Sequence, residues 1–304
     1  MSSFAGRLAD FGYAMGWRVV PKLPSSLAAS LFAVGADLAA RKDGPSVRQL
    51  RKNLARVVPQ ADAGELVDLT RRAMRSYARY WHEAFWLPRS DHDAVAARVD
   101  NTGLEYLEAA LEEGNGAVIA LPHTGNWDAA GLWLVKQSGS FVTVAEKLEP
   151  PSLYKRFVEY RESLGFEVVP ADGSVSFRTL LRALRDNKVI CLVGDRDMTR
   201  SGLPVTFFGE ETRFPAGPAR LAASTGAALL PAGTWFTEQG WNVRIHPRIR
   251  VNARDEIHPA TQALADIFAA DIAAHPTDWH MLQKFWSADR DAADANADSS
   301  GGAG

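Results

Sequence analysis

The stretch Ala117-Val-Ile-Ala-Leu121-Pro-His-Thr-Gly-Asn-Trp-Asp128 passes from an apolar run into polar residues and then into helical periodicity. Five apolar residues bounded by a proline are typical of a buried strand. Short apolar runs recur at 141–144, 189–193 and 228–232, and amphipathic stretches near 126–138, 152–164, 175–186 and 217–225 separate the four runs. This alternation predicts an α/β domain with a mixed, centrally parallel sheet flanked by helices.

The chain of 304 residues is expected to form one domain with three parts. Residues 1–90 show helical spacing and form an N-terminal helical extension, residues 91–288 form the α/β core, and residues 289–304 combine Asp with small residues and form a disordered tail. The period-two run at 241–246 predicts an antiparallel edge strand, and 259–274 and 276–286 predict closing helices. No segment has the ~20 consecutive apolar residues that a membrane-spanning helix needs.

The distribution of charge points to a membrane surface. The formal net charge of −2 argues against a nucleic-acid binder. Residues 1–56, however, carry nine basic and three acidic side chains, with Trp17 beside Arg18 near Lys22. Basic and aromatic residues on a helical segment favour peripheral docking to anionic lipid, and a solvated helical surface is the alternative. The single Cys fits a reducing compartment. We therefore expect a peripheral protein on the cytoplasmic face of the plasma (inner) membrane.

The polar residues after the 117–121 run contain the elements of an acid–base site. His123 can act as a general base whose second ring nitrogen is held by a carboxylate, here Asp128. Gly125 would let the chain turn tightly enough to bring the two side chains together. The alternative is structural: Asn126 or Asp128 caps a helix and His123 is a polar loop residue. Further acids follow neighbouring runs, namely Glu146, Asp195 and Asp197.

The segment His123-Thr-Gly-Asn-Trp-Asp128 has the form HX4D and resembles the lipid A late acyltransferase branch of the glycerolipid acyltransferase superfamily. The resemblance extends from about residue 50 to 287, and further segments fall in that family's order: Arg51-Lys-Asn-Leu54, 77–88, Tyr160-Arg161, Phe207-Phe-Gly209, 214–219 and Trp279-His-Met-Leu-Gln283. Asp195-Arg-Asp197 together with Ala216-Gly-Pro-Ala219 is most similar to the actinobacterial branch that acylates phosphatidylinositol mannosides.

The resemblance implies transfer of a long acyl chain, palmitoyl, from acyl-CoA to the 6-hydroxyl of the mannose on inositol position 2. His123 would be the base and Asp128 its orienting acid, with Asp197 and Glu146 as further acids on the catalytic side. Substrate contacts would come from Arg161, Asp195 and Arg196. Either Arg161 or the backbone N–H groups of Gly125 and Asn126 would stabilise the oxyanion. Acyl-CoA is then a co-substrate, transfer is direct, and neither a cofactor nor a metal is expected.

Three kinds of alternative remain open from the sequence: another enzyme class, other substrates for the acyl transfer, and a role without catalysis. Asp195-x-Asp197 matches the DxD pattern of metal-dependent glycosyltransferases. The acceptor could be another glycolipid of the lipid A type, and the donor could be acyl carrier protein. A non-catalytic lipid-binding module is the third possibility, but it would have no need for His123 beside Asp128.

Overall fold

The computed structural model describes residues 4–197 and 201–290 of the chain. Its centre is a seven-stranded sheet in the order β1-β9-β8-β2-β5-β3-β4. Strands β8, β2, β5, β3 and β4 are parallel, whereas β9 is antiparallel to β8 and β1 is parallel to β9. The predicted α/β class with a mixed, centrally parallel sheet is confirmed. The strands are β1 Val99–Thr102, β2 Ala117–Leu121, β3 Val142–Ala145, β4 Glu167–Pro170, β5 Val189–Val193, β8 Ala228–Phe236 and β9 Trp241–Ile245.

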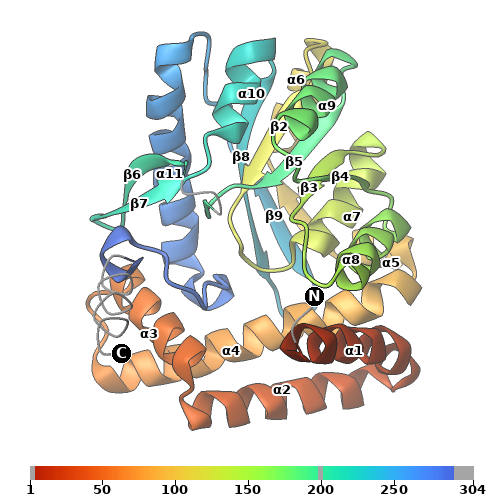
Figure 1. The fold of residues 1–304 in the computed structure, drawn as a ribbon, viewed down its shortest axis with the longest axis vertical. Helices are drawn as coiled ribbons and strands as arrows, with labels where there is room; N and C mark the ends of the chain where they lie inside the picture. The colour runs from red at the N-terminus through yellow and green to blue at the C-terminus, as the bar shows by residue number, and fades with distance from the viewer. Residues whose placement is uncertain (1–3, 198–200, 291–304) are drawn as a thin grey trace, which may run out of the picture.

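Helices cover both faces of this sheet (Figure 1). Side chains alternate along a strand: Val118 and Ala120 of β2 enter the core on one face, and Ile119 and Leu121 enter the core on the other. Both faces are buried, which explains why the central strands read as continuous apolar runs. The first face packs against α9 Ser174–Arg185, α10 Gly217–Thr225 and α11 Ile257–Ala274; the second packs against α5 His92–Ala96, α6 Leu104–Glu112, α7 Trp127–Ser138 and α8 Pro151–Ser163.

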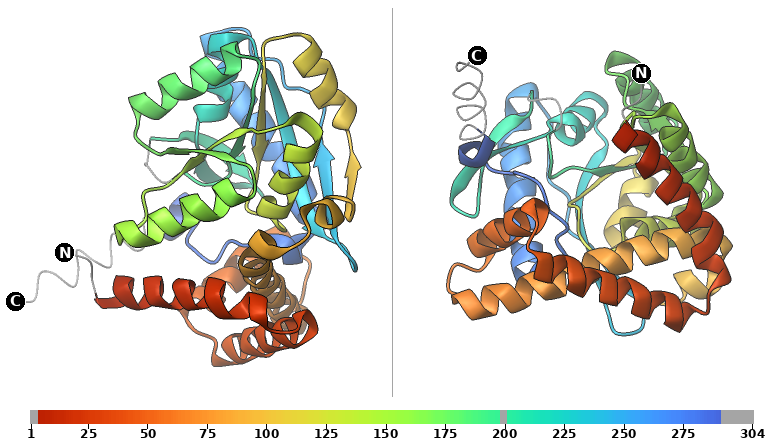
Figure 2. Two further views of the ribbon diagram at one scale, coloured as in Figure 1. Left: turned by 90° about the vertical axis from the view of Figure 1, so that its right-hand side faces the viewer. Right: turned by 60° about the horizontal axis from the view of Figure 1, so that its bottom comes forward.

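The N-terminal residues form a helical layer, as predicted. Figure 1 shows α1, α2 and α4 below the α/β core, and Figure 2 shows the same end of the molecule from other directions. A capping box between Asp62 and Glu65 starts α4. Among the described residues, no helix combines the length and the apolar character needed to cross a membrane. The layer consists of α1 Phe4–Val19, α2 Ser25–Lys42, α3 Pro45–Val57, α4 Ala63–Trp86 and the short 3-10 helices η1 Val20–Lys22 and η2 Leu87–Arg89.

A hairpin that is separate from the seven-stranded sheet lies between β5 and β8 in the sequence. It pairs β6 Leu203–Phe207 with β7 Glu210–Phe214 in antiparallel register. The turn residues Phe208 and Gly209 have φ of 49° and 80°, the positive values that two-residue hairpin turns require. The Phe207-Phe-Gly209 segment is thus the tip of a hairpin.

Two expectations about chain elements are wrong. β9 is antiparallel to β8, as expected, but it is not an edge strand, because β1 pairs along its outer side. The closing helix expected at 276–286 is reduced to the 3-10 turn η4 Pro276–Asp278. The chain is extended after this turn because Trp279 forms an antiparallel bridge with Thr124. A second 3-10 turn, η3 Arg254–Glu256, precedes α11.

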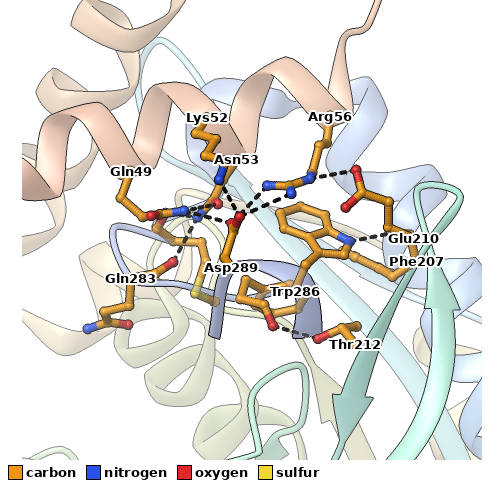
Figure 3. A network of polar contacts seen from close by, with 12 residues as sticks. Gln49, Lys52, Asn53, Arg56, Phe207, Glu210, Thr212, Gln283, Trp286 and Asp289 are labelled. Carbon is orange, nitrogen blue, oxygen red and sulfur yellow. Dashed lines mark hydrogen bonds and ion pairs between the residues drawn. The ribbon is translucent and has the colours of Figure 1, made fainter. Parts of the chain in front are cut away.

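The first two residues of the tail expected at 289–304, Asp289 and Arg290, are helical instead of disordered. Residues 287–290 are helical, and the Asp289 side chain is only 3% exposed because Lys52 and Arg56 of α3 pair with it and Gln49 donates to it (Figure 3). Arg56 also bonds Glu210 and lies over the Trp286 ring. The remainder of the expected tail, 291–304, lies outside the described residues.

Candidate active site

The strand register brings His123 and Asp195 together. β2 and β5 are adjacent and parallel, and Leu121 is paired with Val193 at their carboxyl ends. His123 and Asp195 each come two residues after this pair, so both leave the sheet at the same level. The carboxyl edge of the sheet therefore presents a His–Asp pair.

Asp195 holds the imidazole at two points. His123 Nδ1 lies 2.5 Å from Asp195 Oδ1, and the His123 backbone N–H donates to Oδ2 at 3.0 Å. The indole N–H of Trp279 also donates to Oδ2, at 3.2 Å. Burial opposes ionisation of Asp195, but the adjacent His123 and these hydrogen bonds outweigh it and lower the pKa of the carboxyl.

The second ring nitrogen of His123 is the reactive one. An ionised Asp195 can only accept hydrogen bonds, so the neutral imidazole carries its proton on Nδ1 and leaves the Nε2 lone pair free. The His123 side chain is 26% exposed, so a substrate can reach it. The Trp127 ring lies edge-on to the imidazole, with centroids 5.5 Å apart. This is the arrangement of a general base with an orienting carboxylate.

Asp128 is engaged elsewhere. It lies in the first turn of α7, fully buried, and receives hydrogen bonds from Tyr80 Oη at 3.0 Å and Arg161 Nε at 3.1 Å. The expectation that Asp128 holds the imidazole is therefore corrected: Asp195 makes that contact. Asp128 instead joins α7 to α4 and α8. Arg161, expected to meet substrate, is its ion-pair partner and retains 19% side-chain exposure.

The other predicted acids do not contact the imidazole. Asp197, expected to face it, is buried and accepts the backbone N–H of Gly202 at 2.7 Å. The physical reason is the register, which places Asp197 two residues beyond the level of His123. Glu146 follows β3, which is two strands away from β2 and so roughly 10 Å away, and its side chain is exposed. Arg196 bonds Gln283 Oε1.

The loop residues Gly125 and Asn126 have structural partners. Gly125 donates its N–H to the carbonyl of Asp278 at 2.8 Å, so this N–H is not available to an oxyanion. Its φ is +54°, and a Cβ there would lie 2.8 Å from the Thr234 carbonyl oxygen, so only glycine fits. Asn126 is the N-cap of α7, accepting from the N–H groups of Asp128 and Ala129. The capping alternative is thus the one observed for Asn126.

Several residues without a predicted role surround this loop. Glu83 of α4 is buried and accepts hydrogen bonds from Asn126, Trp241 and Arg79. Ser76, Asp278 and His280 form a buried polar cluster next to it. Glu83 and His280 lie in the family-like segments 77–88 and 279–283, and that likeness was the available signal for them. Their partners are distant in sequence, so local pattern could not define their contacts.

An apolar cavity of about 30 Å³ lies between α7 and the sheet, and Trp127, whose ring lies edge-on to His123, forms part of its wall. Trp127 and Thr234 border it, and both Trp127 Nε1 and Thr234 Oγ1 are buried without a hydrogen-bond partner among the described residues. Burial raises the pKa of the Cys191 thiol on its wall to about 12, so this thiol is not a nucleophile. The remaining wall is aliphatic or aromatic: Ile119, Leu121, Trp133, Leu134, Val243 and Ile245.

The Asp195-x-Asp197 pattern does not form a cluster of acids. Asp195 faces His123 and Trp279, whereas Asp197 faces the Gly202 backbone. Within 4–197 and 201–290, no group of three or more His, Cys, Asp or Glu side chains is placed to hold a metal ion.

Comparison with known proteins identifies the family of the chain. The model of the bacterial lipid A biosynthesis acyltransferase family matches residues 3–288. The chain belongs to this family. A phosphatidylinositol mannoside acyltransferase of Mycolicibacterium smegmatis is 54% identical over 286 residues, which cover 93% of each chain. A phosphatidylinositol mannoside acyltransferase of Mycobacterium tuberculosis is 51% identical over 292 residues, covering 95% of this chain and 92% of that one. The resemblance found in the HX4D segment is thereby confirmed for the family.

Proposed function

We propose that this acyltransferase moves a long acyl chain, palmitoyl, from acyl-CoA to the 6-hydroxyl of the mannose on inositol position 2 of phosphatidylinositol mannosides. The names of the mycobacterial relatives support the acceptor class, because these relatives share more than half of their residues with the chain over nearly its full length. The single structural observation that supports the reaction is the partly exposed His123 oriented by buried Asp195.

In the proposed step, His123 Nε2 takes the proton of the mannose hydroxyl as its oxygen attacks the thioester carbonyl. Asp195 stabilises the imidazolium that forms. The tetrahedral intermediate then expels the CoA thiolate, which receives the proton from Nε2. The products are the mannose ester and CoA with a free thiol, so no acyl-enzyme is required. Asp197 and Glu146 have no part in this step, which changes the role expected for them from the sequence.

The cavity beside Trp127 suits the acyl donor. Its wall is apolar, and two unpartnered polar atoms, Trp127 Nε1 and Thr234 Oγ1, border it. An acyl thioester combines an apolar chain with a polar head and would satisfy both features. The cavity is about the size of one water molecule, so a long chain would have to separate α7 from the sheet locally.

The outer face of the helical layer suits a membrane surface. α2 exposes Leu27, Leu31, Val34 and Leu38 at spacings that place them on one helical face. Exposed cations lie at both ends of this stripe, Arg18 and Lys22 before it and Arg41 and Lys42 after it. α1 adds exposed Phe11, Met15 and Val19. An apolar stripe flanked by cations is typical of helices that lie in the interface of an anionic bilayer. We propose peripheral docking there, on the cytoplasmic leaflet.

The proposed function is tested by identifying the product. The purified protein is incubated with acyl-CoAs of different chain lengths or with acyl carrier protein thioesters, each against a panel of glycolipids that includes phosphatidylinositol mannosides. Mass spectrometry should show one added palmitoyl group, and NMR of the isolated product should place it at the 6-position of the mannose on inositol position 2. Acylation of another glycolipid alone, or a reaction that needs a nucleotide sugar and stops with EDTA, would contradict the proposal.

A further inference from the structure

Three consecutive residues at the end of η4, Asp278, Trp279 and His280, each contact either the HX4D loop or Asp195. The segment runs antiparallel to the HX4D loop, with Trp279 bridged to Thr124. The His280 N–H donates to the His123 carbonyl at 2.8 Å. The indole of Trp279, which is completely buried, bonds Asp195.

Asp278 connects three elements. Its carbonyl accepts the Gly125 N–H of the HX4D loop, its Oδ2 accepts the Phe236 N–H at the end of β8, and its Oδ1 accepts the Ser76 hydroxyl of α4 at 2.7 Å. The Asp278 side chain is buried. A carboxylate with two donors placed on different elements holds these elements in one arrangement.

The hydroxyl of Ser76 also sets the state of His280. It has one proton, which it donates to Asp278, so its contact with His280 Nε2 at 3.0 Å requires the ring to donate there. His280 is then the neutral Nε2–H tautomer, and its Nδ1 is a buried acceptor without a partner among the described residues. Burial, with His123 nearby, lowers the pKa of His280 to about 3, which agrees with a neutral ring.

We propose that residues 278–280, tied to α4 through Ser76, form a positioning clamp that orients His123 and Asp195. The clamp rests on the proposed function, in which His123 is the base. It also connects the helical layer to the site, since Ser76 lies on the helix against which α2 packs. None of the three residues needs to touch a substrate for this role.

The first test is the protonation state of His280. Long-range ¹H–¹⁵N NMR spectra of the full chain should show a histidine that remains the neutral Nε2–H tautomer over the whole range from pH 8 down to pH 5. Its signals, assigned from a His280→Gln variant, should change in Ser76→Ala. A charged or Nδ1–H ring at neutral pH would overturn the clamp.

The second test uses Ser76→Ala with Thr70→Val as its matched control. Thr70 is also a buried hydroxyl on α4, but it bonds the Leu66 carbonyl within the same helix. Ser76→Ala should lower kcat on the order of tenfold or more with little change in KM, because a misplaced base slows the chemical step and not binding. Thr70→Val should leave both constants close to wild type. Equal effects of the two variants on kcat would contradict the clamp.

The third test compares Trp279→Phe with Trp286→Phe. Both remove a buried indole N–H from the same aromatic cluster, but Trp286 bonds the Phe207 carbonyl instead of Asp195. Without the indole donor, Asp195 stabilises protonated His123 more strongly, which raises the pKa of His123. The pH at which kcat/KM falls on the acidic side should therefore increase in Trp279→Phe only. Identical limbs in the two variants would contradict the clamp.

The other titratable groups near His123 should affect the pH profiles of the two variants equally. His280 lies on the clamp and stays neutral, Asp128 and Arg161 pair with each other, and Arg196 bonds Gln283.

The experiments also distinguish failure of the clamp proposal from failure of the proposed function. An active His123→Ala variant would remove the proposed base and leave the NMR result standing, whereas a charged His280 in a chain that needs His123 would remove only the clamp.

Discussion

Asp195 and Asp197 are two residues apart, but only Asp195 meets the imidazole. The difference follows from the pairing of Leu121 with Val193, after which His123 and Asp195 occupy equivalent positions. Asp195 is completely buried and bonds His123 through both oxygens, whereas Asp197 bonds the Gly202 backbone. The orienting acid is therefore defined by strand register.

Replacing Asp195 should be far more damaging to catalysis than replacing Asp197. In Asp195→Asn the amide can no longer fix the Nδ1–H tautomer, and we expect kcat to fall on the order of 10³- to 10⁴-fold, as for the orienting acid of a Ser-His-Asp triad. Asp197→Asn keeps an acceptor for Gly202 and should lose less than about tenfold in kcat. Steady-state kinetics with acyl-CoA measures both, and the reverse order of the two effects would contradict the assignment.

Behind the loop, buried Asp128 forms an ion pair with the largely buried Arg161. Burial and, next, the Asp128 carboxylate raise the pKa of Tyr80 well above its ordinary value, so the phenol keeps the proton that it donates to Asp128. Removing one member of a buried pair leaves the other charge uncompensated.

We expect Asp128→Asn to lower the free energy of unfolding by about 3 kcal/mol, because the Arg161 guanidinium then lacks its counter-charge. Arg161→Gln should lower it similarly, and the double variant should lose at least about 1 kcal/mol less than the sum. Urea unfolding of the four proteins measures this coupling. Strict additivity would show that the pair does not stabilise the fold.

Among the secondary elements, α3 is held to the end of the α/β core by Asp289. Hydrogen bonds and ion pairs from Arg56, Lys52 and Gln49 overcome the effect of burial and lower the pKa of Asp289 to about 2 (Figure 3). A carboxyl with a lowered pKa in the folded state stabilises the protein above its unfolded pKa, near 4, and loses this contribution as the pH falls through the folded pKa.

Asp289→Asn should therefore cost about 2 kcal/mol of unfolding free energy at pH 7, and the difference from wild type should shrink between pH 4 and pH 2. Asp100→Asn on the exposed part of β1 is the control and should change little at any pH. Denaturant unfolding across this pH range measures both. A difference that stays constant down to pH 2 would show that ionised Asp289 is not the source of the stability.

The exposed apolar stripe of α2 is the surface that we propose to bind the membrane. Leu31→Glu with Val34→Glu places two charges in the exposed apolar stripe and should weaken binding to anionic vesicles more than tenfold, since each buried apolar side chain contributes about 1.5–3 kcal/mol. Val175→Glu, an exposed apolar position on α9, is the matched control. Vesicle co-sedimentation at low salt measures the binding. Equal binding of all three proteins would locate the docking surface elsewhere.

Across the whole molecule, the helices and strands that could be predicted from the sequence are those whose formation depends on local sequence pattern. The strands at 117–121 and 189–193 and the helix at 217–225 have the expected bounds, because buried parallel strands are short apolar runs and helices are periodic. β1 and β4 were missed: β1 has three exposed polar residues, and β4 has few apolar residues and ends at Pro170. The segment 276–286 has apolar residues at helical spacing, but its backbone pairs with the HX4D loop.

The candidate site was predictable only in part. His123 was identified from its place after a strand, and its environment depends on contacts across the chain. The role of Asp195 depends on the strand register, and the roles of Asp278 and His280 depend on the path of the extended segment after η4. Asp289 pairs with residues of α3 that are more than 230 positions away in the sequence. Composition near Asp289 indicates disorder, while its partners make it one of the most buried acids.

The central claim is that His123 is the base for acyl transfer to a phosphatidylinositol mannoside. The most direct measurement is mass spectrometry of the product formed from palmitoyl-CoA and this acceptor by wild type and by His123→Ala, with vesicle binding of both proteins as the control. We expect a palmitoylated acceptor from wild type, loss of at least about 10³-fold in rate for the variant, and equal binding. Unchanged turnover by His123→Ala would contradict it.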